Sequence, residues 1–384
     1  MKVGISGLFL KPAQVGGAEF LLRGLLIGMA QISEVETFLF LPAHITDWVA
    51  ELEQGDPAYR SLKEHITIIS IPIQGNRFVS EAIQIPRYSY ELALNGLIYP
   101  NYFTPWQWRQ PVPTVTLILD LNHRHYPQYF SLRRRLWLNV IHRATLLNAD
   151  FTATISDFVR QDIEQTYAIK TKHPVVTLPV PILWQRLETV TTPSVQPEQP
   201  FVLCVANHYQ HKNLRILLQA FQKLPDDLSE VQLVLVGQFP QSLMGVRREQ
   251  CDDIPALVSQ LGLQQRVLVT GHISDGELAW YYHHAAIFAF PSLFEGFGMP
   301  AVEALGMGLP TLTTRCTSLP EVTLNLAQYV DDPLDPQEMA EHLTEMLRHR
   351  SQFVPSAEAV AQVRAAYEPT TIARRYLKLL SQNP

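Results

Sequence analysis

The most informative segment of this chain is Phe290–Thr314, FPSLFEGFGMPAVEALGMGLPTLTT. An apolar run ends at Pro291 and a loop with two glycines follows. Pro300 favours a helix start, because its missing N–H has no partner in a first helical turn. Gly308 and Pro310 end this helix before a second apolar run begins. A strand, a glycine-containing loop and a helix in this order are typical of an α/β domain.

Strand-like runs alternate with helix-like segments elsewhere in the chain, which predicts two consecutive doubly wound parallel sheets. The strands expected in the first half are Val3–Ser6, Thr37–Leu41, Ile66–Ile71, Thr114–Leu119, Phe151–Ile155 and Val175–Leu178. Those expected in the second half are Phe201–Val205, Gln232–Val236, Val267–Thr270, Ile287–Phe290 and Thr311–Thr313. Apolar spacing also predicts helices over Leu214–Leu224 and Thr370–Leu380.

Length and composition restrict the domain plan and the class of protein. A chain of 384 residues with 47% hydrophobic residues suits two α/β domains, which we expect at 1–184 and 201–366. The non-periodic, Thr- and Pro-rich segment 185–200 is interpreted as a linker, and 367–384 as a terminal helical segment. The net charge of -6 gives no support for nucleic-acid binding. The N-terminus lacks the pattern of a secretory signal, so we expect a cytoplasmic protein.

The loop after the predicted strand Ile287–Phe290 carries a predicted anion site. The backbone N–H groups of Phe297, Gly298 and Met299 stand at the start of the predicted helix, where the helix dipole favours negative charge. Gly296 and Gly298 allow a ligand to approach the backbone closely. This loop therefore predicts a phosphate-binding segment.

Charged residues flank this segment. Glu295 and Glu303, which are separated by seven residues, are expected to accept hydrogen bonds from sugar or ribose hydroxyls; the alternative is that both are solvated. Lys212 follows the predicted strand Phe201–Val205, at the edge where doubly wound sheets bind ligands. A lysine there can neutralise a departing diphosphate, although a single lysine is more often an ordinary surface residue.

These motifs resemble those of the family 4 retaining glycosyltransferases, which have the GT-B fold. The resemblance is carried by the E-x7-E pair Glu295 and Glu303, by HKN at His211–Asn213 and by TSLPEV at Thr317–Val322. It covers nearly all of Phe201–Leu347 and is looser in the first half. It implies two Rossmann-like domains that face a shared cleft, with the terminal helix packing back on the first domain.

The resemblance also implies an activity and residue roles. The expected reaction moves mannose, glucose or a related hexose from a GDP- or UDP-linked donor to a glycan or lipid-linked acceptor, with retention of configuration. Lys212 would contact the diphosphate, Glu303 the ribose and Glu295 the sugar. The residues expected to bind the donor are Asn207, Lys212, Glu295, Gly296, Phe297, Gly298, Met299 and Glu303. Asn207 stands where family members often carry an arginine.

On the first domain, the resemblance places Gly16 and Gly17 close to the diphosphate and the acceptor. Asp120 and His123 are candidates for orienting the acceptor or for base catalysis. The alternatives are a turn-forming aspartate and an ordinary surface histidine. The family's His-Asp pair appears here as Leu119-Asp120, so the histidine of that pair is missing.

The sequence contains no D-x-D motif, so we expect metal-independent transfer without any cofactor besides the donor substrate. Two other functions stay open, a non-catalytic nucleotide-sugar-binding module and a sugar-nucleotide epimerase of the same fold. A nicotinamide-dependent dehydrogenase is disfavoured because G-x-G-x-x-G is incomplete after the first strand. Ser131–Asn148 is basic and apolar, and suits either a helix at a membrane surface or a core helix with a charged rim.

Overall fold

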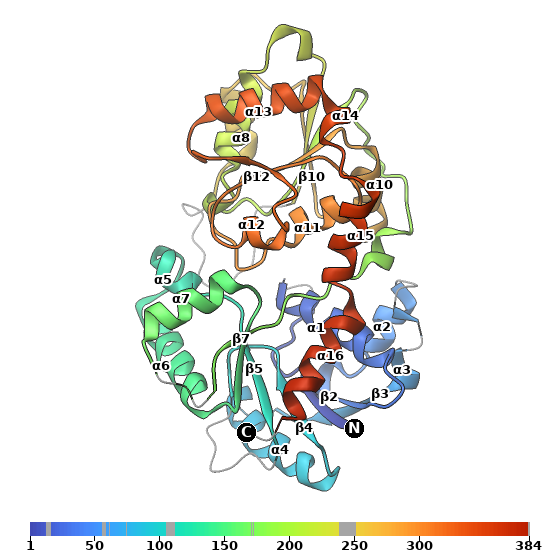
Figure 1. Ribbon diagram of the computed structural model, residues 1–384, viewed down its shortest axis with the longest axis vertical. Helices are drawn as coiled ribbons and strands as arrows, with labels where there is room; N and C mark the ends of the chain where they lie inside the picture. Colours follow the sequence, from blue (N-terminus) through green and yellow to red (C-terminus); the bar gives the residue numbers. More distant parts are fainter. Residues whose placement is uncertain are drawn as a thin grey trace. The chain divides into compact units, whose positions relative to one another are not determined.

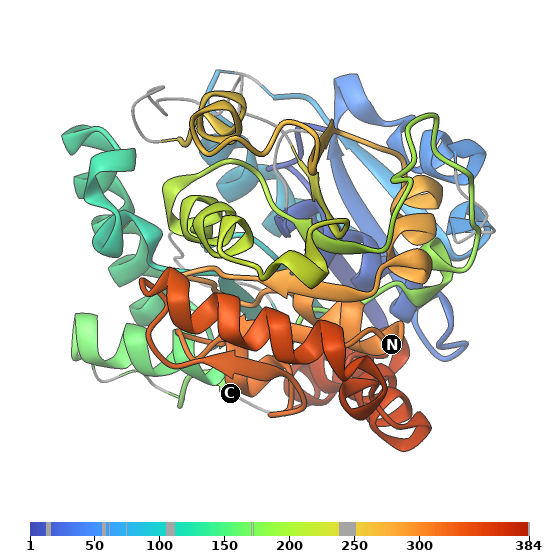
Figure 2. The ribbon, with the colours of Figure 1, turned by 90° about the horizontal axis from the view of Figure 1, so that it is seen from above.

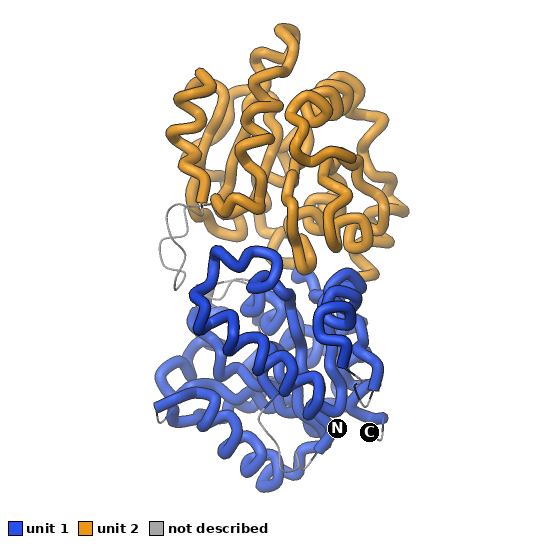
Figure 3. Tube along the Cα trace, turned by 90° about the vertical axis from the view of Figure 1, so that its left-hand side faces the viewer, with its two compact units in different colours: residues 1–183, 367–384 blue, residues 184–366 orange. Residues whose placement is uncertain are grey.

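The computed structural model divides the chain into two compact units (Figure 3). Unit 1 consists of residues 1–183 and 367–384, and unit 2 of residues 184–366. The structure describes the chain except for residues 13–16, 56–58, 61, 74, 105–111, 170, 172, 238–250 and 383–384. Within unit 2, the segment that we interpreted as a linker contributes the short 3-10 helix η4 (Trp184–Leu187), in which Arg186 and Leu187 are buried.

Unit 1 is built on a parallel sheet of seven strands in the order β3-β2-β1-β4-β5-β6-β7 (Figure 1). The strands are β1 Lys2–Ser6, β2 Glu36–Pro42, β3 Ile66–Ile71, β4 Gly96–Tyr99, β5 Thr114–Ile118, β6 Phe151–Thr154 and β7 Val176–Thr177. Its helices are α1 Gly17–Ala30, α2 Trp48–Gly55, α3 Leu62–His65, α4 Arg77–Glu91, α5 Asn122–His125, α6 Leu132–Asn148, α7 Asp157–Tyr167 and α16 Pro369–Leu380.

Unit 2 has a parallel sheet of six strands in the order β10-β9-β8-β11-β12-β13. The strands are β8 Phe201–Val205, β9 Gln232–Val236, β10 Val267–Gly271, β11 Ile287–Phe290, β12 Thr311–Thr314 and β13 Gln328–Val330. The helices are α8 Leu214–Gln222, α9 Ile254–Gln260, α10 Asp275–His284, α11 Met299–Gly306, α12 Leu319–Val322, α13 Pro336–Arg348, α14 Arg350–Phe353 and α15 Ala357–Ala366. In each sheet, the second and third strands along the chain lie on one side of the first strand, and all later strands lie on its other side. This is the doubly wound arrangement that we predicted.

Alternate residues of the unit 2 strands enter two different cores. Val202 and Cys204 of β8 pack with α8, α9 and α13, while Phe201 and Leu203 pack with α10 and α11. Figure 2 shows α8 and α13 side by side on one face of the sheet. Since successive strand side chains point to opposite faces, a strand covered on both sides must be apolar throughout, as the run FVLCV is.

Every strand that we predicted is present, with shifts of one residue at several ends. The predicted helix in Leu214–Leu224 is confirmed as α8 and the one in Thr370–Leu380 as α16. The strands β4 and β13 were not predicted. They have four and three residues, and the pattern of so short a run cannot distinguish a strand from part of a loop or helix.

The terminal helix α16 packs against α1 within unit 1 (Figure 1). The contact requires a glycine, because a Cβ atom at Gly28 would lie 2.2 Å from the carbonyl oxygen of Pro369. Thus the last segment of the chain completes the fold of the first unit. Among the described residues, every helix is too short or too polar to cross a membrane.

Candidate functional site

Lys212 and Glu295 form an ion pair in unit 2, with 2.6 Å between Lys212 Nζ and Glu295 Oε1. Lys212 follows β8 and Glu295 follows β11, the two neighbouring strands between which the order of the sheet reverses. Ligands of doubly wound sheets bind at this reversal, beyond the carboxyl ends of the strands. Only 18% of the Lys212 side chain and 12% of the Glu295 side chain are exposed, so the lysine is not an ordinary surface residue.

Backbone contacts join the loops that carry these two residues. The carbonyl of His211 accepts hydrogen bonds from Leu293 N at 2.8 Å and from Ser292 Oγ at 3.2 Å. Asn213 adopts a left-handed backbone conformation, with φ of 60°, which asparagine tolerates better than most residues. Its Nδ2 donates to the carbonyl of Pro291 at 3.2 Å. The HKN motif therefore attaches the lysine loop to the glutamate loop.

The glutamate loop is also held from the segment after β12. Ser318 is fully buried, and its Oγ lies 3.0 Å from the carbonyl oxygens of both Glu295 and Phe297. Glu295 N donates to Thr317 Oγ1 at 3.0 Å. The TSLPEV motif thus fixes the loop through its first two residues, a role that the sequence alone did not reveal.

The turn into α11 requires a glycine. Gly298 has a φ of 91°, and a Cβ atom there would lie 2.7 Å from a methyl carbon of Leu319. Phe297 is buried, and Met299 opens the helix with Pro300 in its first turn, as predicted. These residues and Gly296 form one continuous turn at the start of α11, while Asn207 is exposed in the loop after β8.

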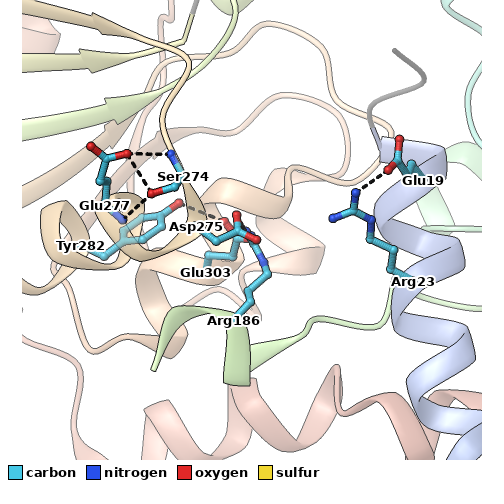
Figure 4. A network of polar contacts seen from close by, with 8 residues as sticks. All are labelled: Glu19, Arg23, Arg186, Ser274, Asp275, Glu277, Tyr282 and Glu303. Atoms are coloured by element: carbon cyan, nitrogen blue, oxygen red, sulfur yellow. Dashed lines mark hydrogen bonds and ion pairs between the residues drawn. The ribbon is translucent and has the colours of Figure 1, made fainter. Parts of the chain in front are cut away.

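Glu303 lies on α11 and is only 2% exposed, so the alternative that both glutamates are solvated is wrong for this one. One carboxylate oxygen accepts a hydrogen bond from Arg186 Nη2, and the other accepts one from the hydroxyl of Tyr282 at 3.1 Å (Figure 4). Arg186 Nη1 donates to Asp275 Oδ1 at 2.6 Å. Sequence reasoning missed Arg186, because it lies in the segment interpreted as a linker.

Of the first-unit candidates, Asp120 and His123 follow the carboxyl end of β5. Asp120 forms a local turn, in which Oδ1 accepts from Asn122 N at 2.9 Å. His123 is 2% exposed, so the alternative of a surface histidine is wrong. Its Nε2 lies 3.2 Å from Asn139 Oδ1, and burial lowers its pKa, which keeps the ring neutral at neutral pH. Gly17 opens α1, whereas Gly16 is outside the described residues.

Residues 190–362 match the family model described as glycosyl transferases, group 1. The O-antigen chain mannosyltransferase B of Escherichia coli is 28% identical over 276 residues, which cover 69% of this chain and 68% of that protein. Among solved structures, Anabaena HepE in complex with UDP and glucose aligns with a TM-score of 0.73 and 18% identity over 100% of both chains. Sucrose-phosphate synthase from Thermosynechococcus elongatus aligns with a TM-score of 0.72 and 20% identity over 99% of this chain and 98% of that one. The architecture is therefore that of the GT-B fold.

Proposed function

We propose that this chain is a group 1 glycosyl transferase, and specifically a retaining hexosyltransferase that uses a GDP- or UDP-linked sugar as donor. The Lys212–Glu295 ion pair at the reversal point of the second sheet carries this proposal. The similarity to an O-antigen chain mannosyltransferase favours mannose as the sugar and a glycan as the acceptor.

The paired charges suggest how the donor binds. Without a ligand, Lys212 and Glu295 neutralise one another in a poorly solvated loop. A diphosphate would attract Lys212 through its charge, and the released Glu295 carboxylate could then accept hydrogen bonds from sugar hydroxyls. The turn at Phe297, Gly298 and Met299 would supply backbone N–H groups to the phosphates as α11 begins.

The transfer step follows from this placement. As the bond between the sugar and the diphosphate breaks, the diphosphate gains negative charge, which Lys212 and the start of α11 stabilise. We propose front-face attack, in which the leaving phosphate takes the proton of the acceptor hydroxyl. The absence of a D-x-D motif supports transfer without a metal ion or further cofactor. Asp120 remains our proposed acceptor-side residue, and Gly16, Gly17 and His123 would line that side.

The experiment measures release of nucleotide diphosphate from a panel of GDP- and UDP-linked hexoses, with and without glycan acceptors. We expect one donor to be turned over by the natural chain, and Lys212→Met and Glu295→Gln to lose that turnover while remaining folded. Arg348→Met is the control, because Arg348 pairs with Asp227 on the exposed surface of the same unit. Unchanged turnover in both Lys212→Met and Glu295→Gln would contradict the proposed mechanism. A product of inverted anomeric configuration would exclude retention.

We also propose that α4 and α6 contact an anionic membrane surface. On α6, Leu132, Leu136, Val140 and Leu147 each expose more than half of their area at spacings of four, four and seven residues, which place them on one helix face. The helix also buries Leu138, Ile141 and Leu146 on its other side, so it is not only a core helix with a charged rim.

The neighbouring helix has the same character. Val79, Ile83 and Tyr90 of α4 are more than half exposed, and α4 contacts α6 through the rings of Phe78 and Trp137, whose centroids are 5.1 Å apart. Helix α6 contains four arginines and no acidic residue in a chain whose net charge is -6. Exposed apolar side chains among arginines match an anionic lipid surface.

Flotation with vesicles tests this contact. We expect binding to vesicles that contain phosphatidylglycerol, weaker binding to purely zwitterionic ones, and loss of binding in the double variant Leu136→Glu and Val140→Glu. Val354→Glu, at an exposed apolar residue of unit 2, should bind like the natural chain. Absence of binding to anionic vesicles would refute the contact, as would a change of oligomeric state in the double variant without any loss of binding.

A further inference from the structure

We infer that Arg186 is a positioning residue for the nucleotide ribose, which acts by orienting the carboxylate of Glu303. This inference rests on the proposed function, because it takes the ligand of unit 2 to be a nucleotide. Arg186 stands in η4, outside every motif that indicated the donor site. Its role follows from the contacts that it makes with α10 and α11.

The guanidinium of Arg186 joins two acidic side chains. Nη1 donates to Asp275 at the start of α10, and Nη2 donates to Glu303 in the middle of α11. The side chains of Arg186 and Glu303 are 4% and 3% exposed, whereas that of Asp275 is 30% exposed. A planar guanidinium presents these nitrogens in a fixed fork, so the positions of both carboxylates depend on one another. Figure 4 shows Arg186 pointing toward this pair.

Tyr282 holds the second oxygen of Glu303. Its hydroxyl donates at 3.1 Å, and burial together with the Glu303 carboxylate raises the pKa of Tyr282, so that the phenol stays protonated. An ionised carboxylate has about four lone-pair sites. Arg186 and Tyr282 use one on each oxygen, so that sites remain for the adjacent hydroxyls of a ribose. Because Arg186 and Tyr282 each bind one oxygen of Glu303, they fix the plane of the carboxylate and therefore the direction of its remaining lone pairs.

Helix α11, which carries Glu303, contacts the residue at which the chain enters unit 2 and a residue just before the chain leaves it. The chain enters unit 2 at Trp184, whose ring lies against Gly306 of α11, and it leaves after Ala366. Just before this exit, Arg364 Nε donates to the carbonyl of Gly306 at 2.8 Å, and the indole of Trp184 donates to the carbonyl of Arg364 at 3.3 Å. Arg364 therefore supports the same helix as Arg186 without touching Glu303, which makes it a matched control.

The experiment is titration calorimetry with GDP and UDP and with their 2′,3′-dideoxy counterparts. For the nucleotide that the natural chain binds, we expect the ribose form to bind about tenfold more tightly than the dideoxy form, as is usual for hydrogen bonds to a charged group. Arg186→Met should bring this ratio close to one, and Glu303→Gln should do the same. Arg364→Met should keep the natural ratio.

Arg186→Lys covers the case in which the Met variant does not fold, because it keeps the buried charge but loses the fork. We expect Arg186→Lys to fold and to have a reduced ratio. The inference would be overturned if Arg186→Lys kept the natural ratio of ribose to dideoxy affinity, or if Arg364→Met lowered that ratio as much as Arg186→Met does. It would also be overturned if the natural chain bound the ribose and dideoxy nucleotides equally well. If the natural chain bound no nucleotide diphosphate at all, the proposed function itself would fail.

Discussion

Ser318 Oγ lies 3.0 Å from the carbonyl oxygen of Phe297, inside a site where the serine itself is fully buried. A second carbonyl, that of Glu295, shares the same hydroxyl at 3.0 Å. The single hydroxyl proton of Ser318 is thus shared between two backbone acceptors of the loop that we propose to hold the donor. This loop keeps its shape through contacts from a segment that lies more than twenty residues further along the chain.

Ser318→Ala should therefore both destabilise unit 2 and weaken nucleotide binding. Leaving buried carbonyls without a donor costs about 1–3 kcal/mol of unfolding free energy. Denaturant unfolding and calorimetry with the nucleotide diphosphate measure the two effects. Ser229→Ala removes an exposed serine of the same unit and should change neither quantity. Natural nucleotide affinity in a destabilised Ser318→Ala chain would show that the loop shape does not matter for binding.

Lys212→Met and Glu295→Gln should each lower kcat/KM by about 10²–10³, the usual loss when one preorganised charged or hydrogen-bonding group is removed from a transition state. Because the two side chains are paired, the double variant should lose less than the product of the single losses. Steady-state kinetics with the preferred donor measures all three. Fully multiplicative losses would indicate that the two residues act independently.

Glu81 should make the stability of unit 1 depend on pH. This residue is buried on α4, where it accepts a hydrogen bond from Ser6 Oγ. Burial raises its pKa from 4.5 to about 7, although Arg77 and the Ser6 hydrogen bond oppose the shift. Since the folded pKa is above the unfolded one, the stability contributed by protonated Glu81 is fully present below pH 4.5 and is lost as the pH rises through 7.

Glu81→Gln keeps a neutral partner for Ser6 and removes this titration. The unfolding free energy of the variant, relative to the natural chain, should rise by roughly 3 kcal/mol between pH 4.5 and pH 8. Chemical denaturation at several pH values gives the difference curve, in which groups common to both chains cancel. A flat difference curve would show that Glu81 is ionised in the folded protein at neutral pH.

Gly306→Ala should destabilise unit 2, even though alanine favours helices over glycine by about 1 kcal/mol. A Cβ atom at this position would lie 2.3 Å from the ring of Trp184, so the ring would have to move. Overpacking of this kind typically costs about 1–3 kcal/mol. Gly17→Ala is the control, because a Cβ atom there has nothing within 4 Å and the stability should change by no more than about 0.5 kcal/mol. Increased stability of Gly306→Ala would contradict the packing described for Trp184.

Most of the architecture could be predicted from local patterns. A strand that is covered on both faces must be apolar throughout, so runs such as FVLCV are visible without any structure. A run as short as GLIY in β4 cannot be assigned to a strand by its pattern alone. In β4, the place of Gly96 is set by the terminal helix, since a Cβ atom there would meet the side chain of Leu380 at 2.8 Å. A contact between residues so far apart in the chain cannot be predicted from a local sequence pattern.

The same limit applies to the candidate site. Lys212 and Glu295 stand after neighbouring strands, and a parallel sheet brings their loops together, so their meeting follows from topology. Arg186 is different, because it reaches Glu303 across 117 positions of the chain from a segment without periodicity. Its burial could not be predicted, since an arginine is usually exposed.

The most direct measurement compares the affinities of the chain for a nucleoside diphosphate and for the corresponding monophosphate, in the natural protein and in Lys212→Met. We expect the natural chain to bind the diphosphate of guanosine or uridine more tightly than the monophosphate, and Lys212→Met to lose this preference. Equal affinities in the natural chain, or a preference that survives in Lys212→Met, would contradict the claim that Lys212 holds the diphosphate of a sugar donor.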